Sequence, residues 1–434
     1  MRHVSVAILL AGSVAGCLPA QPGAPAKLNL QDAEALALKN HPQVLAAQHV
    51  AAAMNQRIDE TRSAYFPTLA GDVTGSEANP RARIGAGFLT DPSLFDRIGQ
   101  GITLSQLITD SGRTPNLVAS SRLQAGAAAQ TAQATKYDVL VRVNQAYFGT
   151  LRAQGLVKVA QETVAARQLL VDQITALYNN KLRSELDVSF VAVNLSQAKL
   201  LLLQSQDQVQ SAFAELSRAI GSQDAATYEL VDQPLPPSPP AKVEDLVQQA
   251  LSGRPELASL QMNRDAAYRF ERAEKDLVLP NASLVGVGGY TPYIAQLSLP
   301  RKTPPEYEGV AVNIEIPVFN GGLFKARREE AHYRAMEADQ RLRDEAQAVA
   351  RDVRTAWAGT SVAYQRLDVT AEFLRQATLA QELAQGRYNL GLSTIVELTL
   401  AQLNVTEAEI VNLSAKYDYQ SQYATLQYTM GALR

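Results

Sequence analysis

Two acidic residues, Asp187 and Glu397, are the first candidates for chemistry in this sequence, because they occupy equivalent places 210 residues apart. Each follows a short turn and opens an apolar, helix-like segment. Carboxylates that gather around an opening hold cations and make passage selective for charge. The same acids could instead be solvated residues in the first turn of a helix, where the helix dipole favours negative charge. Both interpretations stay open from the sequence.

The sequence contains no motif that indicates an enzyme. The four histidines, His3, His41, His49 and His332, lack the spacing of metal ligands. The sequence also lacks a phosphate-binding glycine loop with lysine, a nucleophile elbow and a zinc-protease motif. A net charge of −3 with intermixed signs offers no basic face to nucleic acid. We therefore expect a protein that is not an enzyme, needs no cofactor or metal, and does not bind nucleic acid.

The two acids lie in an internally duplicated chain. Residues 32–67 match residues 245–280 at a constant offset of 213, and from Gly112 onward the offset to the second copy is 210. Duplication on this scale predicts a pseudo-symmetric fold. The joining segment is rich in proline and cannot be helical. The expected divisions are repeat 1 (30–221), a linker (222–242) and repeat 2 (243–434).

The N-terminus reads as a secretory signal peptide over residues 1–16, in which Arg2 precedes an apolar core too short to span a bilayer. The residues from Val14 to Cys17 resemble the lipobox of bacterial lipoproteins, in which the cysteine is acylated and becomes the new N-terminus. Cys17 is the only cysteine, so the chain cannot form an intramolecular disulfide. Either Cys17 anchors segment 17–29 to lipid, or the signal is cleaved after Ala15 and the cysteine is incidental.

Each repeat contains two segments with strand periodicity. Apolar and polar residues alternate, as Val310, Val312 and Ile314 do with their neighbours, which is typical of transmembrane β-barrel strands. Four strands cannot close a barrel and would leave two unpaired edges in lipid. Several chains must therefore share one barrel. The expected strands are about 67–76 and 98–108 in repeat 1, and about 281–290 and 307–317 in repeat 2.

Long helices are expected after the strands. Residues 112–178 and 322–388 contain little Gly or Pro and predict about 100 Å of helix each. Each ends at a short turn and returns as a shorter helix, giving helical hairpins over 112–221 and 322–431. A leading helix, 30–64, broken at Pro42, would stack on the returning helix to match the long one in length. These lengths predict a uniform cylinder of helices.

The duplicated order of helix, two strands and long hairpin, together with the turn YNLGLSTIVEL at 388–398, resembles the TolC-like outer-membrane efflux and export family from about Leu28 onward. The resemblance implies a mainly α-helical fold with a membrane β-barrel. It implies a homotrimer in which three chains of four strands form a twelve-stranded barrel in outer-membrane lipid, and the hairpins form an α-barrel in the periplasm. It also implies a periplasmic adaptor protein and an inner-membrane pump of the RND or ABC type as partners.

The resemblance places an adaptor-contacting turn at the periplasmic tip of repeat 2, whereas an ordinary helix C-cap would use Gly391 equally well. Lys181 stands where repeat 2 has Gly391, so we expect the two adaptor sites of a protomer to differ. The residues concerned are Asn389, Leu390, Gly391, Leu392 and Ser393 in repeat 2, and Lys181 and Leu182 in repeat 1.

A gate is also implied at these tips. Threefold repetition would turn Asp187 and Glu397 into two acid rings near the narrowest point. Ser393 and Leu400 occupy positions that are charged in some relatives, which disfavours a salt-bridged gate and favours an apolar constriction at Leu400. Tyr178 and Tyr388 could hydrogen-bond between neighbouring hairpins or pack against an adjacent helix.

We therefore expect a passive channel of a tripartite efflux system that exports small molecules, either drugs or metal ions. A lipidated Cys17 would favour efflux over protein secretion. The alternatives are an outer-membrane conduit for type I protein secretion and a structural coiled-coil protein that spans the periplasm.

Overall fold

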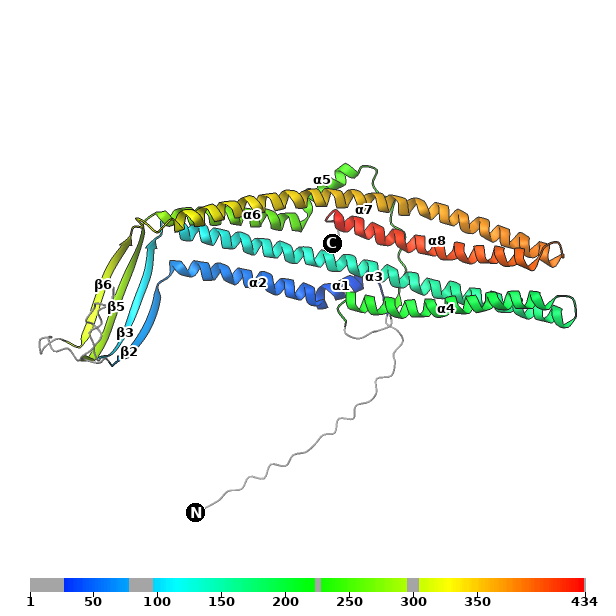
Figure 1. Ribbon diagram of the computed structural model, residues 1–434, viewed down its shortest axis with the longest axis horizontal. Helices are drawn as coiled ribbons and strands as arrows, with labels where there is room; N and C mark the ends of the chain where they lie inside the picture. Colours follow the sequence, from blue (N-terminus) through cyan, green and yellow to red (C-terminus); the bar gives the residue numbers. More distant parts are fainter. Residues whose placement is uncertain (1–26, 78–96, 223–227, 295–303, 433–434) are drawn as a thin grey trace, which may run out of the picture.

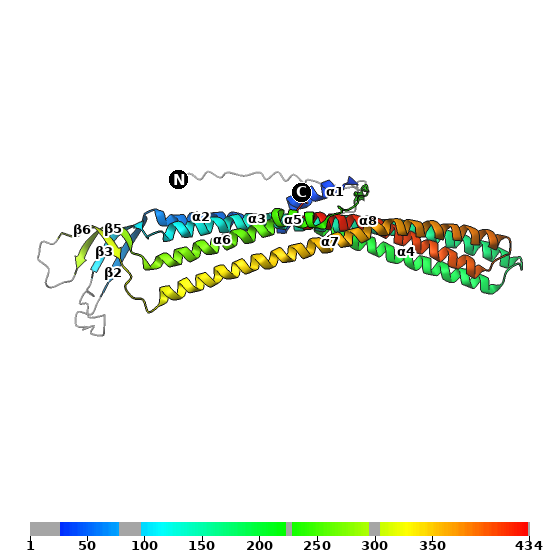
Figure 2. The ribbon, with the colours of Figure 1, turned by 90° about the horizontal axis from the view of Figure 1, so that it is seen from above.

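The computed structural model describes residues 27–77, 97–222, 228–294 and 304–432. Figures 1 and 2 show an elongated molecule with a small sheet at one end and two hairpin turns at the other. The expected signal peptide and Cys17 lie outside the described residues. The expectation of a mainly helical, internally duplicated chain with four strands is confirmed.

Both repeats contain the same elements in the same order. Repeat 1 consists of β1 (Lys27–Leu28), α1 (Leu30–Asn40), α2 (Pro42–Arg62), η1 (Ser63–Tyr65), β2 (Thr68–Ser76), β3 (Arg97–Thr109), α3 (Arg113–Asn179) and α4 (Glu185–Ala219). Repeat 2 consists of β4 (Glu229–Leu230), α5 (Val243–Gly253), α6 (Pro255–Lys275), η3 (Asp276–Val278), β5 (Asn281–Ile294), β6 (Glu306–Glu315), α7 (Leu323–Asn389) and α8 (Ile395–Thr429).

Proline divides the leading helix of each repeat. His41 and Arg254 stand directly before Pro42 and Pro255, and both have extended backbone, with ψ of 123° and 126°. The proline ring excludes the helical conformation for the preceding residue, yet its own fixed φ suits the first position of a new helix. One helix therefore ends and another begins at each of these points.

The four long strands form one antiparallel sheet in the order β2-β3-β5-β6. Its pairing places Leu69 opposite Leu104, Leu104 opposite Gly286, and Gly286 opposite Val310. Directly paired residues point to the same face, so one face of the sheet is mainly apolar. β5 runs beyond the expected end at 290, to Ile294, and β6 ends at Glu315 because Pro317 cannot donate to a ladder. β2 and β6 are the two unpaired edges.

The short helices of each repeat meet end to end. Gly221, just past α4, has a φ of +74°, and a Cβ there would lie 2.8 Å from the Cα of His41. Gly431, just past α8, has a φ of +69°, and a Cβ there would lie 3.3 Å from the carbonyl oxygen of Gly253. Glycine allows both approaches and both positive φ angles without strain, so α4 abuts the α1–α2 break and α8 abuts the α5–α6 break. The expected stacking of short helices alongside each long helix is confirmed.

The linker lies on one face of the helices and is held there by side chains of three of them. The Tyr147 hydroxyl of α3 accepts from Val231 N at 3.1 Å, Trp357 Nε1 of α7 donates to Pro240 O at 2.7 Å, and the Tyr419 hydroxyl of α8 donates to Pro237 O at 2.5 Å. Prolines cannot donate backbone hydrogen bonds but their carbonyls accept them. The proline-rich segment is therefore fixed to the hairpins rather than free to act as a hinge.

Small residues dominate the contacts between the helices. The buried positions of α7 include Ala331, Ala335, Val349 and Val353, which allow close approach of neighbouring helices along its length. Among the described helices, only α4 is apolar and long enough to cross a membrane by composition, and 22% of its most apolar window is buried. Of its other large apolar side chains, Leu186, Phe190, Val193, Leu200 and Leu203 are exposed on the single chain.

Candidate functional site at the hairpin tips

Both long helices end in the same backbone turn. Leu182 N donates to Leu177 O at 2.9 Å, and Leu392 N donates to Arg387 O at 2.8 Å, the bond that closes a Schellman motif. The residue before each leucine is left-handed: Gly391 has a φ of +71°, and Lys181 has a φ of +59°. The two tips therefore share one backbone path although only one has glycine. They differ in the Lys181 side chain and in the strain of about 1 kcal/mol that its Cβ adds.

The two candidate acids lie in the first turn of the returning helices, but they bond differently. The Asp187 carboxylate accepts from Ser184 N at 3.1 Å, while Ser184 Oγ accepts from Asp187 N at 3.2 Å, which completes a capping box. Glu397 N donates to Thr394 Oγ1 at 3.2 Å, but among the described residues the Glu397 carboxylate has no hydrogen-bond partner. Asp187 thus stabilises its own helix, whereas Glu397 presents an unpaired charge.

The two tips of one chain touch through Tyr388. The guanidinium carbon of Arg183, in the first tip, lies 4.6 Å from the ring centroid of Tyr388 at the end of α7. Tyr388 is 5% exposed, and its hydroxyl has no hydrogen-bond partner among the described residues. Burial raises the pKa of Tyr388, the Arg183 charge opposes this, and Asp187 adds to it. Within the chain, Tyr388 therefore packs against the neighbouring hairpin rather than hydrogen-bonding to it.

An apolar cluster surrounds this contact and joins the two hairpins. Its members come from α3, α4, α7 and α8, and include Leu170, Ile174, Val191, Ile395 and Leu398. Tyr178, the counterpart of Tyr388, is 40% exposed because nothing in the described chain covers it. The equivalent tyrosines thus have different environments in the single chain.

Exposed apolar residues stand one turn beyond both acids. Leu400 is 58% exposed, and Phe190, its counterpart at the offset of 210, is 43% exposed. Leu390, Leu392 and Leu182 are exposed at the turns themselves. Sequence reasoning selected Leu400 but missed Phe190, which the repeat offset could have found. It also missed Arg183, because only the folded chain brings that residue to Tyr388.

The histidines of the described part of the chain make local contacts and do not gather into a metal site. There, no group of three or more His, Cys, Asp or Glu side chains could hold a metal ion. His41 caps α2, since its Nδ1 accepts from Gln43 N at 3.2 Å, and His332 Nδ1 lies 3.0 Å from Glu271 Oε1.

A sheet with two open edges at one end of helices about 100 Å long, and a pair of acid-bearing turns at the other, define the subunit of an assembled membrane conduit. The sequence model of the family described as "Outer membrane efflux protein" matches residues 35–222 and 246–432. The chain belongs to this family. It is therefore an outer-membrane channel protein of the TolC family and a transporter rather than an enzyme.

Known relatives match the chain over most of its length. It is 26% identical to the alkaline protease secretion protein AprF of Pseudomonas aeruginosa, over 94% of this chain and 85% of AprF. It is 21% identical to the outer membrane protein TolC of Salmonella enteritidis, over 87% of this chain and 77% of TolC. A crystal structure of CusC superposes with a TM-score of 0.80 at 18% identity, covering 93% of this chain and 92% of that one.

Proposed function

We propose that this protein is the trimeric outer-membrane channel of a tripartite efflux system, and that it passively exports small molecules delivered by an inner-membrane pump through a periplasmic adaptor. The observation that carries the proposal is the sheet with its apolar face and its two unpaired edges, β2 and β6. Unpaired edges are not tolerated in lipid. Three copies, each adding β2 to a neighbour's β6, would close a twelve-stranded barrel.

The helices support the same assembly. α4 and α7 lie on opposite sides of the α3–α8 contact, and both expose apolar residues. Val193, Leu200 and Leu203 lie on α4, and Val362, Val369 and Leu383 lie on α7. Pseudo-symmetry maps the contact between α3 and α8 onto one between α7 and the α4 of the next copy. Assembly would bury these side chains and complete the cylinder.

The tips supply a gate. Within each protomer Arg183 stacks on Tyr388, whereas between protomers the same pseudo-symmetry sets Ser393 against the exposed Tyr178 of the next copy. A serine cannot make a cation–π contact. The contacts between protomers are thus the weaker ones, and opening would begin there. Glu397 and Asp187 would face the entering cargo as acid rings, with Leu400 and Phe190 as an apolar constriction behind them.

The turns are also the proposed adaptor contact. Leu390, Leu392 and Leu182 are exposed leucines at the far end from the sheet, which suits them to apolar contact with a partner. Because Lys181 follows the same backbone path as Gly391, one adaptor fold could dock on both turns. The added cation of Lys181 would distinguish the two sites.

Small-molecule cargo, either a drug or a metal ion, is the first proposal, and protein cargo is the second. The printed name of AprF, a protease secretion protein, favours the second. Cys17 favours the first, because we propose that it is lipidated, as in efflux lipoproteins. The pump would be of the RND type for efflux and of the ABC type for type I secretion.

Purified full-length protein in planar bilayers tests the channel. The proposal predicts stable trimers on cross-linking and single-channel conductance. Monomers without conductance would leave only the structural coiled-coil interpretation, which family membership already disfavours. Export assays in a host lacking its own channel, with a drug and a secreted protease as separate cargoes, distinguish the two kinds of cargo.

A further inference from the structure

The break between the two leading helices has a different charge balance in each repeat. In repeat 2 the break residue is Arg254, whose side chain is 7% exposed. Its guanidinium donates to both oxygens of Glu256, at 3.3 and 3.2 Å, and lies 5.4 Å from the ring centroid of Tyr428. A buried cation requires such a partner. In repeat 2 the chain supplies the anion itself.

Two further carboxylates stand near Arg254. The Tyr428 hydroxyl donates to Asp138 of α3, and Glu345 of α7 acts on Arg254 through its charge. Burial lowers the pKa of Arg254. The hydrogen bonds and charge of Glu256, together with the charges of Tyr428 and Glu345, raise the pKa by more, so the pKa of Arg254 is raised overall. This junction therefore combines one buried cation with several nearby acids.

Repeat 1 has more cations and fewer acids at the same place. The offset of 213 puts His41 and Gln43 at the positions of Arg254 and Glu256. The offset of 210 puts Arg218 and Thr135 at those of Tyr428 and Glu345. The carboxylate of Glu256 is thus replaced by the amide of Gln43, and that of Glu345 by the hydroxyl of Thr135. Tyr428 is replaced by Arg218.

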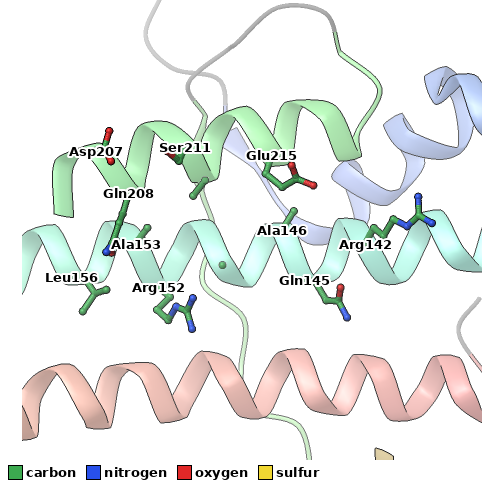
Figure 3. Close-up of a pocket in the computed structure, with 12 residues that line it drawn as sticks. Arg142, Gln145, Ala146, Arg152, Ala153, Leu156, Asp207, Gln208, Ser211 and Glu215 are labelled. Carbon is green, nitrogen blue, oxygen red and sulfur yellow. The ribbon is translucent and has the colours of Figure 1, made fainter. Parts of the chain in front are cut away.

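A crevice of about 490 Å³ lies at this junction, and His41, Gln43, Arg142, Glu215 and Arg218 all line it. Arg142 Nη1 donates to the amide oxygen of Gln43 at 3.1 Å, and Arg218 Nη1 lies 3.1 Å from Glu215 Oε1. The crevice therefore contains two guanidinium groups but one carboxylate, Glu215, which pairs with Arg218. Arg142 of α3 and Glu215 of α4 also line a second groove between these helices, and Figure 3 shows the two residues in that groove.

His41 adds a neutral donor to the crevice. It is 8% exposed, and its Nδ1 accepts from Gln43 N, so the proton of the neutral ring is on Nε2. Among the described residues Nε2 has no hydrogen-bond partner. Burial lowers the pKa of His41, and the charges of Arg142 and Arg218 lower it further. The ring therefore stays neutral near pH 7 and can donate one hydrogen bond.

We propose that the crevice between His41, Arg142 and Arg218 binds a small oxyanion, either inorganic phosphate or the carboxylate of an organic acid. The bound anion takes the place that Glu256 fills in repeat 2. Arg142 provides a charge-assisted contact, since its only partner among the described residues is a neutral amide. Arg218 and the Nε2 of His41 complete the donor set. Among the described residues of repeat 1, Gln43 stands at the position of Glu256, so no carboxylate is supplied there.

In the proposed trimer, one contact of repeat 2 would lose its carboxylate at this site. Within the chain, the Tyr428 hydroxyl donates to Asp138. The offset of 210 maps this contact onto one between Arg218 and Ala348 of the partner subunit. A methyl group thereby replaces the carboxylate, so this contact would bring no negative charge to the site.

The test is calorimetric titration of the purified full-length protein in detergent with sodium phosphate, at constant ionic strength set by chloride. Arg142→Gln should weaken phosphate binding about tenfold or more, because a charged hydrogen bond is lost. Gln43→Glu should abolish it while leaving the protein folded, since that change restores the carboxylate of repeat 2. Arg334→Gln, which removes an exposed pair with Glu330, is the control and should change nothing.

A parallel titration with succinate distinguishes the two sources of oxyanion. Binding of both ligands indicates a general oxyanion site, and binding of one alone identifies its chemistry. Equal phosphate binding by the natural protein, Arg142→Gln and Gln43→Glu would overturn the proposal, as would binding of neither ligand. Conductance does not enter this experiment, so its result is independent of whether the chain forms the proposed channel.

Discussion

Arg183 lies over the ring of Tyr388, with 4.6 Å between the guanidinium carbon and the ring centroid, and this contact connects the two hairpin tips of one chain. The repeat places Ser393 at the position of Arg183 and Tyr178 at that of Tyr388. The chain therefore holds its own tips together by a contact that pseudo-symmetry cannot reproduce between copies.

Removal of this contact should favour the open channel. A cation–π contact at a partly exposed site contributes about 0.5–1 kcal/mol, so Arg183→Ala should raise the ratio of open to closed states about two- to fivefold. Single-channel recording in planar bilayers measures the open probability. Arg183→Lys keeps the charge, so its open probability should lie between that of the natural protein and that of Arg183→Ala. An open probability that falls in Arg183→Ala would contradict the role of this contact.

The acids at the tips should set the ionic preference. Neutralisation by Asp187→Asn together with Glu397→Gln should bring the cation-to-anion permeability ratio close to that of bulk solution. The reversal potential in a KCl gradient reports this ratio. Glu407→Gln, in the middle of α8, is the control. An unchanged permeability ratio in the double variant would contradict the acid-ring hypothesis.

Single variants should distinguish the roles of Asp187 and Glu397. Asp187 takes part in a capping box, whereas the Glu397 carboxylate has no hydrogen-bond partner among the described residues. Asp187→Asn should therefore lower the thermal midpoint as well as selectivity, and Glu397→Gln should change selectivity alone. Equal effects of both variants on the midpoint would contradict the difference in bonding.

Substitutions of the two left-handed residues at the tips should change the stability of the protein in opposite directions. Lys181→Gly should stabilise the protein by about 1 kcal/mol, because glycine adopts a positive φ without strain. Gly391→Ala should destabilise it by a similar amount, and through the backbone alone, since a Cβ at Gly391 would meet nothing within 4 Å. Thermal unfolding of the two single variants measures both. A loss of stability in Lys181→Gly would be inconsistent with a strained turn.

The hydrogen bond that attaches the linker to Tyr419 should be lost at alkaline pH. Burial, followed by Tyr423 and Tyr364, raises the pKa of Tyr419 from 10.0 to about 12. A group whose pKa is raised on folding stabilises the fold below its unfolded pKa, and the contribution is lost as pH rises toward 12. Tyr419→Phe should cost about 1 kcal/mol at about pH 8 and flatten the pH dependence of the thermal midpoint between about pH 10 and 12. Tyr333→Phe, on an exposed part of α7, should leave both unchanged.

Lipidation of Cys17 is tested by metabolic labelling with a palmitate analogue. The natural chain should incorporate the label and Cys17→Ser should not, because this is the only cysteine in the sequence. Equal labelling of both would mean that the lipobox interpretation is wrong.

Much of the architecture could be predicted because its signals are local. Pro42 and Pro255 end and start helices through the geometry of their own rings, and alternating residues such as Val310 and Val312 define a strand face. The duplication adds long-range information, since it aligns the two hairpins without a gap. The open-edge argument then follows from counting strands. None of these inferences needs the position of any side chain in space.

The details of the site depend on tertiary structure. The sequence predicts that Lys181 distinguishes the tips, and the structure adds that lysine and glycine share one left-handed backbone there, so that the tips differ in side chain and not in backbone path. Tyr178 and Tyr388 are equivalent in sequence, but only Tyr388 is buried, since packing of one hairpin on the other covers one tyrosine and leaves its counterpart for another copy.

The sequence by itself thus determined the repeat, the order of helices and strands, and the need for several copies, because periodicity, proline and glycine act on neighbouring residues. Only the tertiary structure decided which residues meet across the repeats. Arg183 reaches Tyr388, and His41 lines one crevice together with Arg142 and Arg218, because helices distant in sequence pack side by side. Contacts of this kind depend on the direction of side chains in space, which no local pattern specifies.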